Sequence, residues 1–127
     1  LTQAMAAPYC TMNLADMGAD VIKIEPPGEG EPTRQLGAAH KNGHSATFMT
    51  MNRGKRDLAV NLKRPEGVEI MKRLARTADV FVQNYRPGVA ARRGVGWGAL
   101  CAGNPAGATL TWIPQPEGKQ KGAKAKK

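Results

Sequence analysis

The chain has 127 residues and a mass of 13.6 kDa, which suits one domain and leaves little room for a second. Hydrophobic residues make up 41% and charged residues 23%, which excludes both a disordered chain and a membrane span. Two cysteines cannot form the disulfide framework of a small secreted domain. No run reaches the roughly 18–20 apolar residues of a transmembrane helix, and no signal-peptide pattern is present. We therefore expect a cytoplasmic protein.

The formal net charge of +9 divides between two parts of the chain. Five lysines and one glutamate give residues 106–127 a net charge of +4, and residues 1–105 carry the remaining +5. A lysine-rich tail can bind nucleic acid or an acidic partner, whereas a moderately basic body can bind a phosphorylated small molecule. Because aromatic residues are only 5% of the chain and no known nucleic-acid motif is present, specific nucleic-acid binding is not expected.

Apolar spacing and turn residues predict alternating helices and strands. A helix over 8–16, stopped by Gly18, leads into a β-rich run at 20–25. Residues 26–47 show no period and predict a long surface loop. The later elements are expected in the order strand 58–62, helix from Pro65, strand 79–83, turn 84–88, and short helices 89–93 and 97–102.

This alternation predicts an α/β domain with a mostly parallel sheet. The three central residues of the 79–83 strand are all apolar, which is typical of a buried parallel strand. Residues 106–127 lack periodicity and have little apolar content, so we expect a disordered basic tail there. The chain is therefore divided into a domain over 1–105 and a tail over 106–127.

Two groups of residues could bind an anionic ligand. The string MNRGKR at 51–56 places three cations and a glycine just before a strand; it could wrap a phosphate or be a solvated basic loop, and composition alone favours the loop. The turn at 84–88, followed by Arg92, lies at the carboxyl end of a predicted parallel strand, where open α/β sheets bind ligands. The alternative for that turn is an ordinary connection with a solvated arginine.

The remaining reactive side chains do not predict a site. His40 and His44 are four residues apart, but Asn42-Gly43 between them argues against a helix, and no third ligand is evident, so no metal is expected. Cys10 lies at a predicted helix start without a base partner, and we interpret it as a small buried hydrophobic residue.

Four strings, taken together and in this order, resemble the class III CoA-transferases, which include formyl-CoA and carnitine CoA-transferases and the related alpha-methylacyl-CoA racemases. They are APYCTMNLADMGADVIKIEPPG at 7–28, NRGKR at 52–56, LKRPEG at 62–67 and ADVFVQNYRPG at 78–88. Asn104-Pro105 also fits the family, as the pair that precedes its next strand.

The resemblance implies a Rossmann-like CoA-binding domain, here partial, in a family that forms interlocked homodimers. It implies acyl-CoA and a carboxylic acid as substrates, with coenzyme A bound at the sheet edge. The cofactor contacts that it implies are Met5 and Ala6 near the first helix, Val60, Asn61, Leu62 and Lys63 along the nucleotide, Asn84, Tyr85 and Arg86 beside the thioester arm, and Arg92. The family's catalytic Asp matches no residue of this chain, so we assign no catalytic residue.

The sequence departs from the family pattern at both ends of the matched region. Family members begin with a strand ahead of Leu1-Thr2, so the sheet is expected to lack a first strand, and the match stops at Pro105. We expect the N-terminal portion of an acyl-CoA:carboxylate CoA-transferase that works through a covalent carboxylate intermediate and is inactive alone. An epimerising racemase of the same family is the alternative, and a non-catalytic basic nucleotide- or nucleic-acid-binding fragment is the alternative of another class.

Overall fold

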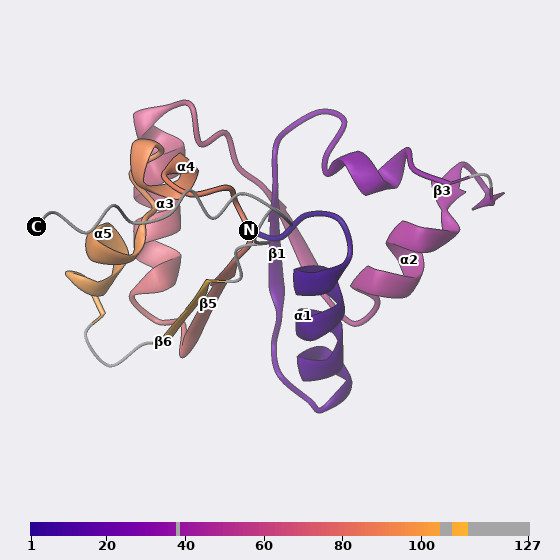
Figure 1. Cartoon of the computed structure of the whole chain (residues 1–127), viewed down its shortest axis with the longest axis horizontal. Coiled ribbons are helices and arrows are strands. Elements are labelled where there is room, and N and C mark those ends of the chain that lie inside the picture. Colours follow the sequence, from indigo (N-terminus) through magenta and orange to yellow (C-terminus); the bar gives the residue numbers. More distant parts are fainter. Residues whose placement is uncertain (38, 105–107, 112–127) are drawn as a thin grey trace, which may run out of the picture.

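The structure is a computed structural model that describes residues 1–37, 39–104 and 108–111. Helices and strands alternate along most of this length (Figure 1). The elements are α1 (Ala6–Asp16), β1 (Ile22–Glu25), the 3-10 helix η1 (Pro32–Arg34), β2 (His40–Lys41), β3 (His44–Ser45), α2 (Ala46–Asn52), β4 (Arg56–Ala59), α3 (Pro65–Ala75), β5 (Val80–Gln83), α4 (Val89–Arg92), α5 (Trp97–Cys101) and β6 (Ala108–Thr111). None of the helices in the described ranges is long and apolar enough to cross a membrane.

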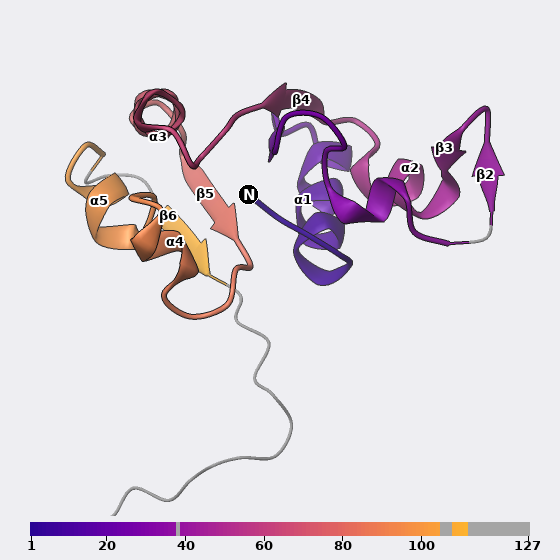
Figure 2. The same ribbon diagram turned by 90° about the horizontal axis from the view of Figure 1, so that it is seen from above.

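The strands form three separate pairs in the part of the chain that is described. β1 pairs with β4 and β5 pairs with β6, both in parallel, while β2 and β3 form a small antiparallel hairpin. Parallel pairing is therefore confirmed, but among the described residues the pairs do not join into the single, mostly parallel sheet that the sequence predicts. In Figures 1 and 2, β1 and β4 lie with α1 and α2, and β5 and β6 lie with α3, α4 and α5.

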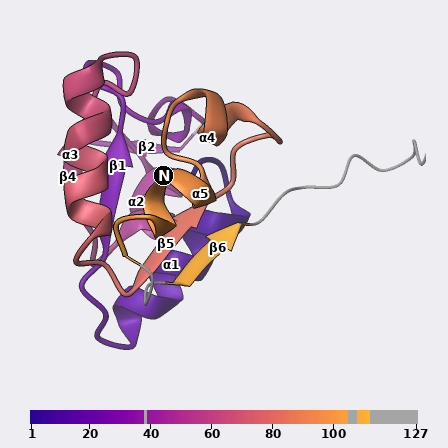
Figure 3. The same ribbon diagram turned by 90° about the vertical axis from the view of Figure 1, so that its left-hand side faces the viewer.

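The N-terminal residues lie between these two halves. The backbone nitrogen of Leu1 donates to the carbonyl oxygen of Val82 in β5 at 3.2 Å, and the carbonyl of Thr2 accepts from the Lys23 side chain of β1 at 3.3 Å. Leu1 is also buried in the main hydrophobic cluster. Its other members are Ile24, Val60, Leu62, Met71, Ala75, Ala90, Val95 and Leu100. Residues of β1, of the segment after β4 and of α3, α4 and α5 therefore share one core. Figure 3 shows the ribbon from the side on which these helices lie.

Helix α3 begins at Pro65, as predicted, because its sequence carries strong local signals. Proline is preorganised for a first turn, Glu66 complements the positive end of the helix, and basic residues occupy the last turn. The helix buries Gly67, Met71 and Ala75. A Cβ on Gly67 would lie 2.2 Å from the backbone oxygen of Asn61, so glycine is needed for this close approach between α3 and the end of β4.

The region predicted as a long loop contains unexpected structure. Within 26–47 the chain forms η1 and the β2–β3 hairpin, and α2 begins at Ala46 with the Ser45 hydroxyl accepting from Phe48 N–H. The hairpin turn is Asn42-Gly43, and both residues have positive φ (52° and 78°). This sequence is the strongest short hairpin signal, but the flanking residues lack the apolar alternation that would have pointed to strands.

Two strand predictions are corrected. β4 covers Arg56–Ala59 rather than 58–62, because β1, its partner, ends at Glu25 before two prolines. β5 is not the buried strand expected: Val80 is 42% exposed, and Gln83 is its buried residue. β5 bonds along one edge to β6, and the Leu1 end of the chain lies at its other edge.

The expected disordered tail also needs correction. Residues 108–111 form β6, parallel to β5, so part of the 106–127 segment is a strand. Threonines alternate with leucine there, and such residues favour strands when a free strand edge is available. The prediction for residues 112–127 lies outside the described residues.

Candidate functional site

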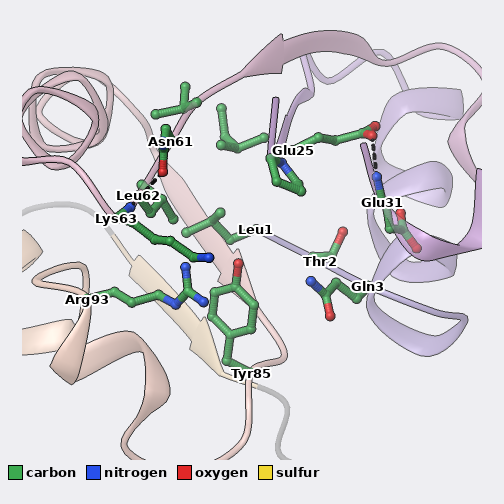
Figure 4. A pocket seen from close by; sticks show the side chains of 13 residues that line it. Leu1, Thr2, Gln3, Glu25, Glu31, Asn61, Leu62, Lys63, Tyr85 and Arg93 are labelled. Carbon is green, nitrogen blue, oxygen red and sulfur yellow. Dashed lines mark hydrogen bonds between the residues drawn. The ribbon is translucent and has the colours of Figure 1, made fainter. Parts of the chain in front are cut away.

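A hollow of about 150 Å³ lies where β1, β4 and the turn after β5 end (Figure 4). This is the carboxyl edge of the parallel strands, the edge at which open α/β folds bind ligands. Its walls come from the N-terminal residues, the end of β1, the residues after β4 and the α4 region. The lining residues are Leu1, Thr2, Gln3, Ile24, Glu25, Pro26, Glu31, Val60, Asn61, Leu62, Lys63, Tyr85 and Arg93.

One end of the hollow is cationic. Figure 4 shows the side chains of Lys63, Arg93 and Tyr85 pointing toward the same space beside Leu1. The Arg93 guanidinium lies 5.8 Å from the centre of the Tyr85 ring, which holds the two together. In the described part of the chain neither Lys63 nor Arg93 forms an ion pair, so both charges remain available to an anion.

The Tyr85 hydroxyl can act as a hydrogen-bond donor at this end. Burial raises the pKa of Tyr85 above its ordinary value, and the charge of Arg93 offsets part of that rise. The phenol is therefore protonated at neutral pH. The turn after β4, which carries Lys63, is ordered by a hydrogen bond of its own. The Lys63 N–H donates to the Asn61 side-chain oxygen at 3.0 Å.

The two carboxylates of the hollow are neutralised within the fold. Glu25 receives hydrogen bonds from Arg34 at 2.7 and 2.9 Å and from the Glu31 N–H at 2.8 Å. Burial by itself would raise the pKa of Glu25, but these bonds and the charges of Arg34 and Lys23 lower it below its ordinary value. Glu31 pairs with Lys23 in a fully buried contact. Neither carboxylate is left free to repel an anion.

The N-terminal wall is held by side chains rather than by a strand. Gln3 N–H donates to the Asn84 side-chain oxygen at 2.8 Å, and the Asn84 amide donates back to the Gln3 carbonyl at 2.7 Å. Ala4 N–H donates to Glu31 at 2.9 Å. Ala4 has a φ of 60°, an unusual value for alanine.

The structure brings half of the sequence-predicted contacts to the hollow. Val60, Asn61, Leu62, Lys63 and Tyr85 line it. Met5, Ala6, Asn84, Arg86 and Arg92 are not among its lining residues. Asn84 adjoins it through Gln3, and Arg92 is exposed on α4 with its guanidinium beside Gly88. Contacts from these five residues to a ligand stay predictions.

Sequence reasoning missed Arg93, the N-terminal residues and the two carboxylates. Arg93 directly follows the last residue of α4, Arg92, and only Arg93 of the two lines the hollow. The short separation of Arg93 from Tyr85 in the sequence could have pointed to a contact between them, because arginine commonly packs over aromatic rings.

The basic string at 51–56 is occupied by contacts within the fold. Arg53 pairs with Asp16, and Arg56 pairs with Asp20. Lys55 donates to the carbonyls of Pro8 and Met51 and to the Asn52 side chain at 2.8–2.9 Å. Burial, with Lys23 nearby, lowers the pKa of Lys55 to about 8. The phosphate-wrapping interpretation of this string is therefore not supported.

The other reactive residues lie away from the hollow. His40 and His44 occupy opposite strands of the β2–β3 hairpin, opposite Ser45 and Lys41, and both are exposed. In the described ranges no three His, Cys, Asp or Glu residues gather as a metal site. Cys10 is exposed on α1, so its interpretation as a buried residue was wrong.

Comparison with known proteins gives a consistent result. The model of CoA-transferase family III matches residues 1–106. A succinyl-CoA:glutarate CoA-transferase of Mus musculus is 50% identical over 97 residues, covering 76% of this chain and 22% of the relative. A formyl-CoA:oxalate CoA-transferase of Rhodopseudomonas palustris is 40% identical over 104 residues, covering 82% of this chain and 24% of the relative.

Solved structures agree with the sequence matches. A mutant of Rv3272 from Mycobacterium tuberculosis superposes with a TM-score of 0.83 at 35% identity, covering 97% of this chain and 34% of that one. The chain thus spans about a quarter of the length of the curated relatives and a third of that structure. The resemblance in the four sequence strings is confirmed, and the chain belongs to CoA-transferase family III.

Proposed function

We propose that this chain is the CoA-binding segment of a cytoplasmic acyl-CoA:carboxylate CoA-transferase. In this role its residues hold the nucleotide of coenzyme A while the acyl group passes between carboxylic acids through a covalent carboxylate intermediate. None of this chain's residues is assigned to the covalent step. We also propose that the whole protein forms a homodimer.

The observation that carries the proposal is the charge arrangement of the hollow. Its two cations, Lys63 and Arg93, have no ion pair in the described residues, while its two carboxylates are neutralised by Arg34 and Lys23. The hollow is therefore a net positive site at the ligand-binding edge of parallel strands. Phosphate groups suit such a site because arginine and lysine bind them through charge-assisted hydrogen bonds.

The size of the hollow limits what it can enclose. At about 150 Å³ it is smaller than most pockets that enclose a whole ligand, which run to roughly 300–1,000 Å³. It can take one part of coenzyme A, and we place a phosphate there because of the two cations. The rest of the ligand would lie over the surface near α1 and α4, where Met5, Ala6, Arg86 and Arg92 are exposed.

The transferase chemistry is favoured over epimerisation by the relatives. The two curated proteins described above are named as CoA-transferases, acting on succinyl-CoA with glutarate and on formyl-CoA with oxalate. We propose an acyl-CoA and a small carboxylic acid as the substrates of the whole protein. The racemase alternative remains a weaker proposal within the same family.

The test is a calorimetric titration of the 127-residue chain with three ligands of decreasing phosphate content: coenzyme A, dephospho-coenzyme A and pantetheine. We expect affinity to fall in that order, and added salt to weaken coenzyme A most, because salt screens charge-based binding. Lys63→Ala should reduce the affinity for coenzyme A and leave that for pantetheine unchanged. The matched control is Lys72→Ala, on α3 and outside the hollow. Absence of coenzyme A binding, or equal binding of pantetheine, would contradict the proposal.

A further inference from the structure

The N-terminal wall of the hollow depends on contacts that a regular element would normally provide. We call residues Thr2, Gln3 and Ala4 the wall segment. Thr2 and Gln3 line the hollow, yet the wall segment belongs to neither a helix nor a strand. Its backbone groups bond to the side chains of Asn84, Glu31 and Lys23. Its shape is therefore set by those side chains.

Asn84 makes the most specific of these contacts. Its side-chain oxygen accepts from Gln3 N–H at 2.8 Å, and its amide nitrogen donates to the carbonyl of the same residue at 2.7 Å. Two strand residues that form a hydrogen-bonded pair exchange the same two bonds. Asn84 directly follows β5, and Leu1 already donates a hydrogen bond to Val82 of that strand. The side-chain amide of Asn84 therefore extends the hydrogen bonding between β5 and the N-terminal residues to the wall segment.

Glu31 holds the other end of the wall segment. Its carboxylate accepts from Ala4 N–H at 2.9 Å and from the Thr33 hydroxyl at 2.6 Å, and it pairs with Lys23. Glu31 is 1% exposed, so its position is fixed by packing. Ala4 takes up a left-handed backbone, which alanine disfavours, so this conformation needs support from outside the segment.

We infer that Asn84 is a positioning residue, which acts on the bound ligand through Gln3 rather than by touching it. The inference rests on the proposed function, because it assumes that the hollow binds coenzyme A. Gln3 lines the hollow and Asn84 does not. Both the oxygen and the nitrogen of the Asn84 side-chain amide are used in contacts with the Gln3 backbone. This differs from the direct cofactor contact that the sequence resemblance implies for Asn84.

The experiment measures amide hydrogen exchange and coenzyme A binding in the same variants of the 127-residue chain. Without ligand, Asn84→Ala should speed exchange at the Gln3 amide roughly two- to tenfold, the change expected for one lost hydrogen bond. The Val60 amide, which donates to Glu25 in the core, should be unchanged and reports that the variant is folded. Affinity for coenzyme A should fall by a similar factor.

Two further variants make the result specific. Asn84→Asp keeps an acceptor for Gln3 N–H, so it should retain the protection of that amide and fold even if the alanine variant does not. Asn13→Ala is the matched control: its amide bonds to the Tyr9 carbonyl on the exposed face of α1, and its loss should change neither readout.

Each possible result decides the inference. Faster exchange at Gln3 together with weaker binding supports it. Weaker binding with unchanged exchange at Gln3 overturns it, because Asn84 would then contact the ligand directly. Faster exchange with unchanged affinity also overturns it, because the wall segment would then not shape the site. If the unmodified chain does not bind coenzyme A, the proposed function fails and the inference, which rests on it, fails as well. Exchange at Gln3 then still shows whether Asn84 holds the wall segment.

Discussion

Replacement of Arg93 by alanine tests the cationic end of the hollow most directly. Arg93 lines the hollow beside Tyr85 and has no ion pair in the described residues, so its charge is available to a bound phosphate. A hydrogen bond to a charged group contributes about 1.5–3 kcal/mol, and each 1.4 kcal/mol changes an equilibrium constant about tenfold. Arg93→Ala should therefore raise the dissociation constant for coenzyme A by roughly ten- to a hundredfold.

The assay is calorimetric titration of coenzyme A at two salt concentrations. The variant should lose part of the salt dependence as well as affinity, because one of the screened charges is gone. Arg93→Lys keeps the charge but loses the planar fork and should show an intermediate affinity. Arg73→Ala, an exposed position near the end of α3, is the matched control and should change little.

Arg92→Ala belongs in the same series. The sequence resemblance implies a cofactor contact there and a loss of the same size, whereas the structure places Arg92 outside the hollow. A loss at both positions would show that the ligand extends from the hollow over α4. Equal, measurable affinities in the unmodified chain and Arg93→Ala would refute the assignment of a phosphate to this end.

Three other outcomes follow from the structure. The pKa of Glu25 is lower in the folded chain than its ordinary value of 4.5, so the ionised carboxylate stabilises the fold above pH 4.5. This contribution is lost as the pH falls through the lower folded-state pKa. In urea unfolding, Glu25→Gln should therefore lose less stability in acid than the unmodified chain does. Gly67→Ala should lower the free energy of unfolding by about 1–3 kcal/mol or more, because the added Cβ would clash with the backbone of Asn61. Gly98→Ala, whose Cβ would have no atom within 4 Å, should change the free energy of unfolding by less than about 1 kcal/mol. The purified chain should not exchange acyl groups between succinyl-CoA and glutarate, because we assign none of its residues to the covalent step. Turnover that is abolished by Glu25→Gln or Glu31→Gln would disprove this.

Part of the site was predictable because its signals are local. The start of α3 depends on Pro65 and its neighbours, and the turn after β5 depends on Pro87-Gly88 following an apolar run. Placing that turn at the carboxyl end of a parallel strand was enough to predict a ligand edge, and Tyr85 does line the hollow. Family membership was also readable from four short strings, because each keeps its order and spacing along the chain.

The tertiary structure decided which charges are free. By sequence, the cations at 51–56 and those around the hollow look alike, but Arg53 and Arg56 meet aspartates 37 and 36 residues away, whereas Lys63 and Arg93 meet none in the described residues. The pairing of β5 with β6 and the contact between Asn84 and Gln3, 81 residues apart, likewise depend on distant segments coming together. Local propensity sets where a helix begins, but the partner of a charge or of a strand edge is set only when remote parts of the chain pack together.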